Sequence, residues 1–359
     1  MTESDFIPKR YTKLIDKGSV SWSSPSNIAL VKYWGKKKDQ IPENPSISFT
    51  LSDCKTITTI CFSKKEKQEE FSFEIYLDAE KKDDFKPKIE TFFKRVEVYL
   101  PFLKTYHFKI ETSNTFPHSS GIASSASGMS ALACCLMSVE KALNPEISEA
   151  FFMQKASFLA RLGSGSACRS LEGDLVVWGY HDEIDGSSDL YGTKYPFDVH
   201  NNFKNYQDTI LLVDKGEKQV SSTIGHNLMH GHPFAKERFK QASKNLSGVI
   251  PVFKKGDLDA FIKIVEIEAL TLHAMMMTSM PYFILMKPNT LEIINKIWVF
   301  REKTNSKVCF TLDAGANVHV LYPENETESV LKFIKNELVA YCQNGHYICD
   351  KIGFGAKQL

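Results

Sequence analysis

A glycine- and serine-rich segment, residues 117–128, constrains more than any other what this chain can fold into. It lies between an apolar run that predicts a strand, Thr105–Glu111, and small apolar residues that predict a helix, Ser124–Ala142. Glycine lets a backbone approach a ligand closely, and the start of a helix offers unpaired N–H groups that suit phosphate. The segment favours an anion-binding turn, while an ordinary serine cap on a helix is the alternative.

The rest of the chain mixes strands and helices without strict alternation, which favours the α+β class. The patterns predict these strands: Lys55–Phe62, Phe71–Leu77, Leu175–Tyr180, Thr209–Val213, Lys307–Leu312, Val318–Tyr322 and His346–Lys351. They predict these helices: Lys88–Phe102, Ser148–Leu162, Gln219–His230, Pro233–Ser247, Leu258–Met277, Leu291–Thr304 and Glu326–Leu338. A chain of 359 residues suffices for two domains of about 100–200 residues each. The polar stretch His181–Tyr206 marks a boundary, so we expect domains at residues 1–205 and 206–359.

The balance of charge argues against nucleic acid as a partner, because 44 basic and 43 acidic side chains leave a formal net charge of +1. None of the eight cysteines forms a CxxC pair, so we expect free thiols rather than disulfides or a zinc site. His226, His230 and His232 lie close together, but their spacing does not match the usual zinc patterns. We find no signal peptide and no stretch near the roughly 18 apolar residues of a membrane span. We therefore expect a cytoplasmic protein without a membrane partner.

Two segments place one charged side chain among small residues. Gly163–Ser170 surrounds Arg169 with glycine and serine, and arginine is the side chain best shaped to bind carboxylate or phosphate with two hydrogen bonds. Thr311–Asn317 places Asp313 after an apolar strand, where small neighbours let the carboxylate face a pocket. Each segment taken alone also fits an ordinary turn with an exposed charge.

Two more segments carry groups suited to anions. Asn27–Lys36 contains two lysines around two aromatic side chains, which could line an anion site or form an edge strand guarded by lysines. Val220–Thr223 has three adjacent hydroxyl groups, which could bind phosphate or cap a helix. Neither segment decides between its two interpretations alone.

The order of these segments is more specific than any one of them. A turn of the form PxxxGxxSSAS before a helix resembles the GHMP kinase superfamily, and within it the chain resembles the diphosphomevalonate decarboxylase family. The resemblance rests on NIALVKYWGK, SISFTLSD, GIASSASG, GSGSACRS, VSST and TLDAGAN, which follow in this order between Asn27 and Asn317. It implies a two-domain α+β fold of the GHMP kinase type with a cleft between the domains. It also implies ATP-dependent phosphorylation of the 3-hydroxyl of mevalonate 5-diphosphate, followed by loss of phosphate and CO₂ to give isopentenyl diphosphate.

The resemblance also implies roles for individual residues. Asp313 matches the family's catalytic aspartate, which would orient or deprotonate the tertiary hydroxyl. Arg169 matches the arginine that binds the substrate carboxylate. Lys32 matches a lysine that balances the charge of the phosphoryl group. The positions expected to line the substrate diphosphate are Tyr33, Lys36, Ser164, Ser166 and Ser222. The positions expected to bind ATP are Ser113, Asn114, Gly121, Ala123, Ser124, Ser125 and Ser127, with Mg²⁺ at Ser124 and Ser125. ATP and Mg²⁺ are thus the expected cofactors, mevalonate 5-diphosphate the expected substrate and a homodimer the expected assembly.

Departures from the family's pattern bear on the substrate. Gln40 and Ala316 stand where asparagine and proline are usual, and His118–Ser120 replaces smaller or less polar residues. Glu172 and Asp174 follow the arginine segment and could weaken anion binding if they face the site. Three alternatives stay open: a relative acting on mevalonate 5-phosphate, a small-molecule kinase that does not decarboxylate, and a non-catalytic protein on the same fold. The diphosphate-side donors favour the diphosphate, and retention of all three expected catalytic residues argues against the last two alternatives.

Overall fold

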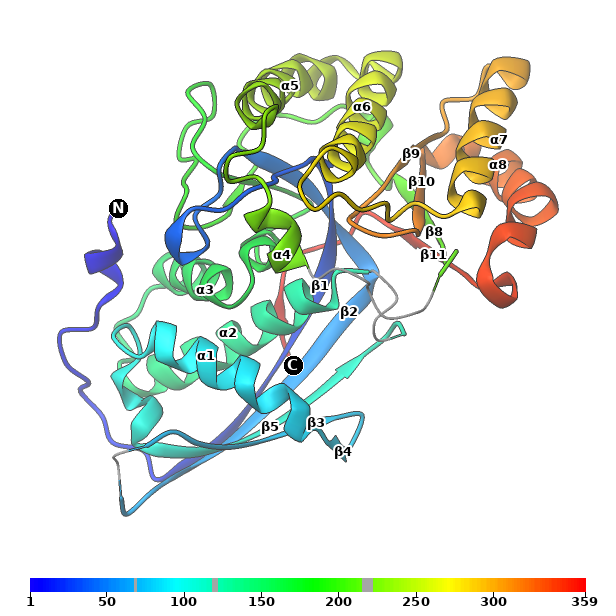
Figure 1. The fold of residues 1–359 in the computed structure, drawn as a ribbon. Coiled ribbons are helices and arrows are strands. Elements are labelled where there is room, and N and C mark those ends of the chain that lie inside the picture. The colour runs from blue at the N-terminus through cyan, green and yellow to red at the C-terminus, as the bar shows by residue number, and fades with distance from the viewer. Residues whose placement is uncertain (68–69, 118–121, 215–221) are drawn as a thin grey trace.

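Two β-sheets with helices packed on them form the described chain (Figure 1). The computed structural model describes residues 1–67, 70–117, 122–214 and 222–359, with only the backbone at 222–223. The larger sheet consists of β1 (Lys17–Val31), β2 (Ser46–Lys64), β3 (Ser72–Leu77), β4 (Glu80–Lys81), β5 (Tyr106–Asn114), β6 (Leu175–Trp178), β7 (Thr193–Lys194) and β12 (Lys357–Gln358). The smaller, antiparallel sheet consists of β8 (Gln207–Leu211), β9 (Cys309–Thr311), β10 (Val318–Tyr322) and β11 (Tyr347–Lys351).

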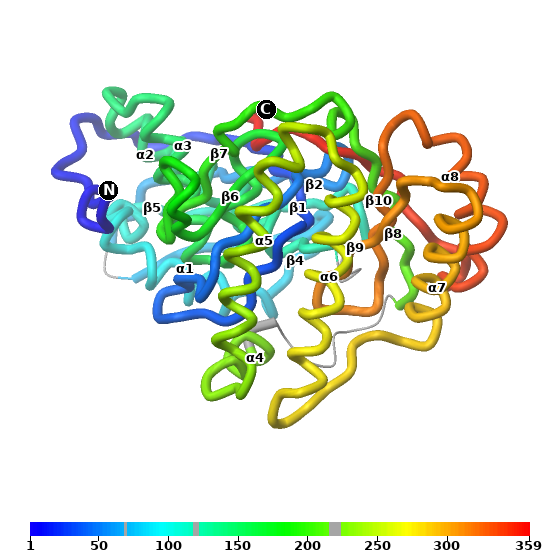
Figure 2. The backbone as a smooth tube through the Cα atoms, turned by 90° about the horizontal axis from the view of Figure 1, so that it is seen from above, coloured from blue at the N-terminus to red at the C-terminus, as the bar shows by residue number. Residues whose placement is uncertain are grey.

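Most of the described helices pack beside one of the two sheets, and one helix contacts both. The helices are α1 (Lys86–Val96), α2 (Ser124–Leu143), α3 (Glu149–Gly163), α4 (Ser222–Asn227), α5 (Ala235–Lys255), α6 (Leu258–Met277), α7 (Pro288–Thr304) and α8 (Thr327–Phe333). Helices α1, α2 and α3 lie on the side of the larger sheet, whereas α7 and α8 flank the smaller one (Figures 1 and 2). Helix α6 contacts both β1 and β9, so it bridges the sheets. The predicted α+β class is confirmed, and the predicted boundary at residues 205 and 206 stays a prediction.

The hydrophobic core is continuous between the two halves. One cluster of buried side chains contains Phe49 from β2, Ile210 from β8, Phe253 from α5 and Phe261 from α6. Burying an aromatic or large aliphatic side chain stabilises a fold by about 1.5–3 kcal/mol. Because this cluster draws on both sheets, it holds them in a fixed relation and keeps the ends of β1 and β9 close together. None of the helices in the described ranges combines the length and apolar character that a bilayer crossing requires.

The segment after β11 returns to the larger sheet. Strand β12 pairs with β1, with Trp22 opposite Gln358. Two glycines make this close approach possible, because a Cβ at Gly353 would meet the Leu51 carbonyl oxygen at 2.3 Å and one at Gly355 would meet the Leu171 oxygen at 2.1 Å. Residues 353–358 therefore lie against the first half of the chain, although they follow the second half in sequence.

Local differences from the predicted elements have physical causes. The predicted helix over Lys88–Phe102 ends at Val96. It cannot continue to Phe102, because Pro101 disfavours helical backbone at Leu100 and opens a separate 3₁₀ turn. The predicted helix over Gln219–His230 lies partly outside the described residues, and the described part ends at Asn227. Strand β1 before Asn27 was not predicted at all.

Candidate active site

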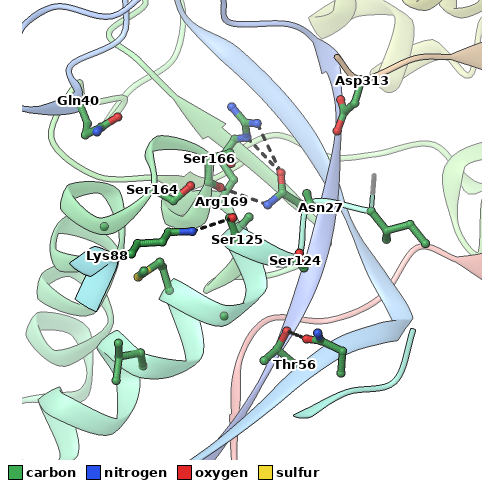
Figure 3. A pocket seen from close by; sticks show the side chains of 18 of the residues that line it. Asn27, Gln40, Thr56, Lys88, Ser124, Ser125, Ser164, Ser166, Arg169 and Asp313 are labelled. Atoms are coloured by element: carbon green, nitrogen blue, oxygen red, sulfur yellow. Dashed lines mark hydrogen bonds between the residues drawn. The ribbon is translucent and has the colours of Figure 1, made fainter. Parts of the chain in front are cut away.

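A cavity of about 720 Å³ lies where the two halves meet (Figure 3). Its lining includes these residues that the sequence singled out: Lys32, Tyr33, Lys36, Asn114, Ala123, Ser124, Ser125, Ser164, Ser166, Arg169 and Asp313. They come from the segment after β1, from β5, from the start of α2, from the turn after α3 and from the turn after β9. The fold thus brings to one place side chains as far apart in sequence as Lys32 and Asp313, which are separated by 281 positions.

Two predicted site residues of the described chain, Ser113 and Ser127, do not line the cavity. Ser127 is fully buried, and its hydroxyl lies 2.6 Å from the Thr56 hydroxyl, so it packs α2 against β2. The backbone of Ser222 opens α4, whereas Gly121, Val220 and Ser221 lie outside the described residues.

Asp313 and Lys32 form an ion pair at the edge of the cavity. The ammonium nitrogen of Lys32 lies 3.1 Å from Oδ1 of Asp313, and the side chains are 3% and 31% exposed. Burial lowers the pKa of Lys32, and the Asp313 carboxylate opposes this shift. His273 donates from Nε2 to the Asp313 carbonyl oxygen at 3.1 Å, and burial lowers the pKa of this histidine to about 4. Asp313 is therefore placed by a neutral imidazole and leaves part of its carboxylate open to the cavity.

The backbone of Lys32 is held by a buried pair that sequence reasoning missed. Glu268 on α6 accepts a hydrogen bond from the Lys32 N–H at 2.8 Å, and Arg238 on α5 donates to the Lys32 carbonyl oxygen at 2.9 Å. The carboxylate and guanidinium also bind each other, and neither side chain has exposed surface. No signal in the sequence could have found them, because charged residues in helices usually face solvent.

Arg169 is a buried cation that belongs to none of the ion pairs of the described chain. It is 2% exposed, and its Nη1 donates to the Ser46 hydroxyl at 2.6 Å. Its Nε lies 3.4 Å from Oδ1 of Asn27 (Figure 3). Its guanidinium lies over the Tyr33 ring, 5.2 Å from the ring centre. Burial lowers its pKa. A desolvated guanidinium held this firmly has donors to offer an anion, for which it is well suited.

The charges around the cavity are strongly unequal. Its basic lining residues are Lys32, Lys36, Lys88 and Arg169, while Asp313 is the acidic one among the described lining residues. Burial lowers the pKa of Lys36 to about 8, so this cation needs little change in pH to lose its proton. The two unusual acidic residues, Glu172 and Asp174, are absent from the lining. This excess of positive charge suits anionic ligands.

The beginning of α2 forms the other end of the cavity. Ala123 adopts a left-handed backbone with φ of 38° just before the helix, which places Ser124 and Ser125 at its first turn. Lys88 on α1 donates to the Ser125 hydroxyl at 2.9 Å, and sequence reasoning missed this lysine (Figure 3). Beyond them the lining is apolar, with Ile75, Leu77, Ile89, Ile110, Met129 and Leu132. A polar helix start beside an apolar recess suits a phosphate group attached to a flat base.

Two family descriptions cover most of the chain. The diphosphomevalonate decarboxylase-like N-terminal domain matches residues 24–189, and the mevalonate 5-diphosphate decarboxylase C-terminal domain matches residues 209–352. The chain belongs to the diphosphomevalonate decarboxylase family. A diphosphomevalonate decarboxylase from Gibberella zeae is 30% identical over 87% of this chain and 82% of its own length. One from Debaryomyces hansenii is 30% identical over 86% of this chain and 80% of its own length.

Solved structures of the family agree with the fold. A structure described as MDDEF in complex with MVAPP, AMPPCP and magnesium is 29% identical, with a TM-score of 0.81 over 96% of this chain and 99% of that one. The mevalonate diphosphate decarboxylase of Enterococcus faecalis is 28% identical, with a TM-score of 0.80 and the same coverage. The family and the fold predicted from the motif order are therefore confirmed.

Proposed function

We propose that this protein uses ATP to convert (R)-5-diphosphomevalonate into isopentenyl diphosphate, with release of ADP, phosphate and CO₂. One observation carries the proposal: the cavity sets four basic side chains against a single described carboxylate, Asp313. A substrate with a diphosphate and a carboxylate needs such a site. The names of the relatives support the same reaction, as does the neighbouring structure with MVAPP, AMPPCP and magnesium.

Asp313 is proposed to act on the tertiary hydroxyl of the substrate. Its carboxylate opens to the cavity and would orient this hydroxyl or take its proton as the γ-phosphoryl group of ATP is transferred. Lys32, 3.1 Å away, would balance the negative charge on the transferred group. The buried contacts to the Lys32 backbone support this role, because they fix the point from which the side chain reaches Asp313.

Arg169 is proposed to hold the substrate carboxylate. Its contacts with Ser46 and Asn27 are to neutral groups, so its charge is still available to a ligand. After phosphorylation, the C–O bond to the phosphate breaks and phosphate leaves. The electron pair of the bond to the carboxylate then forms the new double bond, and CO₂ is released. A fixed guanidinium would keep that bond aligned with the leaving phosphate.

The nucleotide is proposed to bind at the start of α2. Ser124, Ser125 and Lys88 would face its phosphates, with the base in the apolar recess. Mg²⁺ fits this end because it is commonly bound by few protein groups together with phosphate oxygens and water. Consistent with that chemistry, the described residues contain no cluster of three His, Cys, Asp or Glu side chains that could cage a metal alone. Bound Mg²⁺ would neutralise phosphate charge.

A parallel assay tests the proposal. Purified protein with Mg-ATP is given mevalonate, its 5-phosphate or its 5-diphosphate, and ADP and CO₂ are measured separately. We expect equal ADP and CO₂ with the diphosphate only. If both products form with the monophosphate, mevalonate 5-phosphate is the substrate. ADP without CO₂ would identify the protein as a kinase. No product with any of the three compounds would refute the proposed function.

A homodimer in the cytoplasm is the remaining part of the proposal. All eight cysteines are free thiols, as is usual in a reducing compartment. Met280, Tyr282 and Ile284, between α6 and α7, are 82%, 71% and 62% exposed, and apolar side chains of this kind are often covered by a partner. Light scattering on the purified protein tests the dimer, and the location of a tagged copy in cells tests the compartment.

A further inference from the structure

His226 reaches from α4 to the aromatic segment of the cavity wall. Its ring stacks on Tyr33, with centroids 4.8 Å apart and planes at 23°, and lies 4.4 Å from the ring of Trp34. It is 3% exposed and lines the cavity. The proposed reaction gives this histidine no role, and no described His, Cys, Asp or Glu side chains form a metal site with it.

One hydrogen bond defines the state of the ring. The backbone N–H of Gly35 donates to Nδ1 of His226 at 3.0 Å. Nδ1 must then carry a lone pair, and the single proton of the neutral ring lies on Nε2. Burial, together with the charges of Lys36 and Arg169, lowers the pKa of His226 well below its usual value. Nδ1 of the neutral imidazole therefore accepts the hydrogen bond from the Gly35 N–H at neutral pH.

The turn that donates this hydrogen bond needs an acceptor. Gly35 has a φ of 99°, in the left-handed region, and Lys36 follows it into the cavity. The neighbouring Trp34 N–H is satisfied by Oδ1 of Asn44 at 3.2 Å, whereas the Gly35 N–H is satisfied by His226. A buried N–H that loses its acceptor is costly, so the turn depends on the histidine.

A glycine in α4 lets the helix come close enough for His226 to reach the Gly35 N–H. A Cβ at Gly225 would meet the Trp34 ring at 2.7 Å, so only glycine lets the helix approach this closely. His226 then comes directly after the point of contact. The segment that carries Ser222, an expected substrate-binding residue, is thereby joined to the segment that carries Tyr33 and Lys36.

We propose that His226 is a positioning residue whose Nδ1 holds the turn at Gly35, and that it thereby sets the affinity of the cavity for the diphosphate of the substrate. The inference deepens the proposed function and depends on it for the identity of the substrate. The aromatic contacts place the ring, and the hydrogen bond to Gly35 transmits its position to Tyr33 and Lys36.

Two substitutions separate the acceptor from the bulk of the ring. In H226L the acceptor is lost, whereas in H226N the side-chain oxygen can take the place of Nδ1. We expect H226L to raise the KM for mevalonate 5-diphosphate roughly ten-fold, the effect of one lost buried hydrogen bond, and to leave the KM for ATP nearly unchanged. H226N should restore most of the affinity. H230L, at the exposed histidine four residues later, is the matched control.

The KM values distinguish positioning from folding, because a partly unfolded sample loses activity without a change in KM. An unchanged KM for the diphosphate in H226L, equal rises in both KM values, or an H226N variant as weak as H226L would each overturn the proposal. Calorimetric binding of inorganic pyrophosphate supplies a readout without turnover. If the wild type makes no CO₂, the proposed function fails, while a weaker Kd for pyrophosphate in H226L alone would still support the positioning role.

Discussion

A substitution in the buried pair of Glu268 and Arg238 tests whether this pair holds the backbone of Lys32 in place. E268Q keeps the size of the side chain but leaves a fully buried guanidinium without its counter-charge. Breaking a buried ion pair from one side costs about 3–5 kcal/mol. For 359 residues, at roughly 2.1 cal/mol/K of unfolding entropy per residue, a loss of about 4 kcal/mol lowers the Tm by roughly 5 °C.

Activity should fall further than stability alone explains. Glutamine keeps only one acceptor oxygen, so in E268Q the donors from Lys32, Arg238 and Asn245 can no longer all be satisfied. A resulting misplacement of Lys32 by about 1 Å near the chemistry costs on the order of 100-fold in rate. The assay combines calorimetric unfolding with kcat measured well below the Tm. The matched control is E237Q, because Glu237 on α5 is 76% exposed and pairs only with a surface lysine in the described chain.

A double substitution decides whether the two charges act as a pair. R238M/E268Q removes the stranded charge, so its loss of Tm should be smaller than the sum of the losses in R238M and E268Q. A Tm of E268Q within about 1 °C of the wild type, which is the range of an ordinary surface substitution, would refute the reasoning. Strictly additive losses in the double variant would refute it as well.

Three other substitutions test the cavity itself. D313N should lower kcat by about 10²–10⁴-fold with little change in substrate Kd, because the base is lost and the shape is kept; turnover within tenfold of the wild type would contradict the role. R169K should nearly abolish CO₂ release, measured with labelled carboxylate, since lysine cannot donate two parallel hydrogen bonds; near-normal release would contradict it. Lys36 loses its charge as pH rises through about 8, so kcat/KM should fall above that pH, and K36R should remove the fall; a fall that persists in K36R would assign it to another group.

Periodic segments were predictable from the sequence, and segments stabilised by distant partners were not. Helix α6 and strand β10 have the bounds that the patterns predicted. The long apolar segment of α6 and the short, fully buried apolar run of β10 are signals carried by the segments themselves. Strand β1 begins with alternating serines, at Ser19, Ser21 and Ser23, which have little intrinsic preference for strands. Pairing with β2 along its length makes it a strand, and the sequence of β1 holds no record of that partner.

The residues of the site also fall into two groups, those that the sequence motifs predicted and those that they did not. The order of the motifs predicted that Lys32, Arg169 and Asp313 would meet, and all three line one cavity. Arg238 and Glu268 could not be predicted, because their importance lies in contacts with the backbone of a residue more than 200 positions away. His226 drew attention only as a possible metal ligand, since a hydrogen bond to a glycine N–H leaves no mark on either residue type.

The return of β12 to β1 bears on how the protein is made. Trp22 leaves the ribosome long before its partner Gln358, and at about 5–20 residues per second the interval is on the order of half a minute. During that time the outer edge of β1 has unpaired N–H and C=O groups, which invite pairing with other chains. The nascent chain is thus most prone to aggregate just before its synthesis reaches residues 353–358, and those few residues close the edge. At a high level of expression more nascent chains would expose this edge at the same time, and more chaperone capacity would be needed.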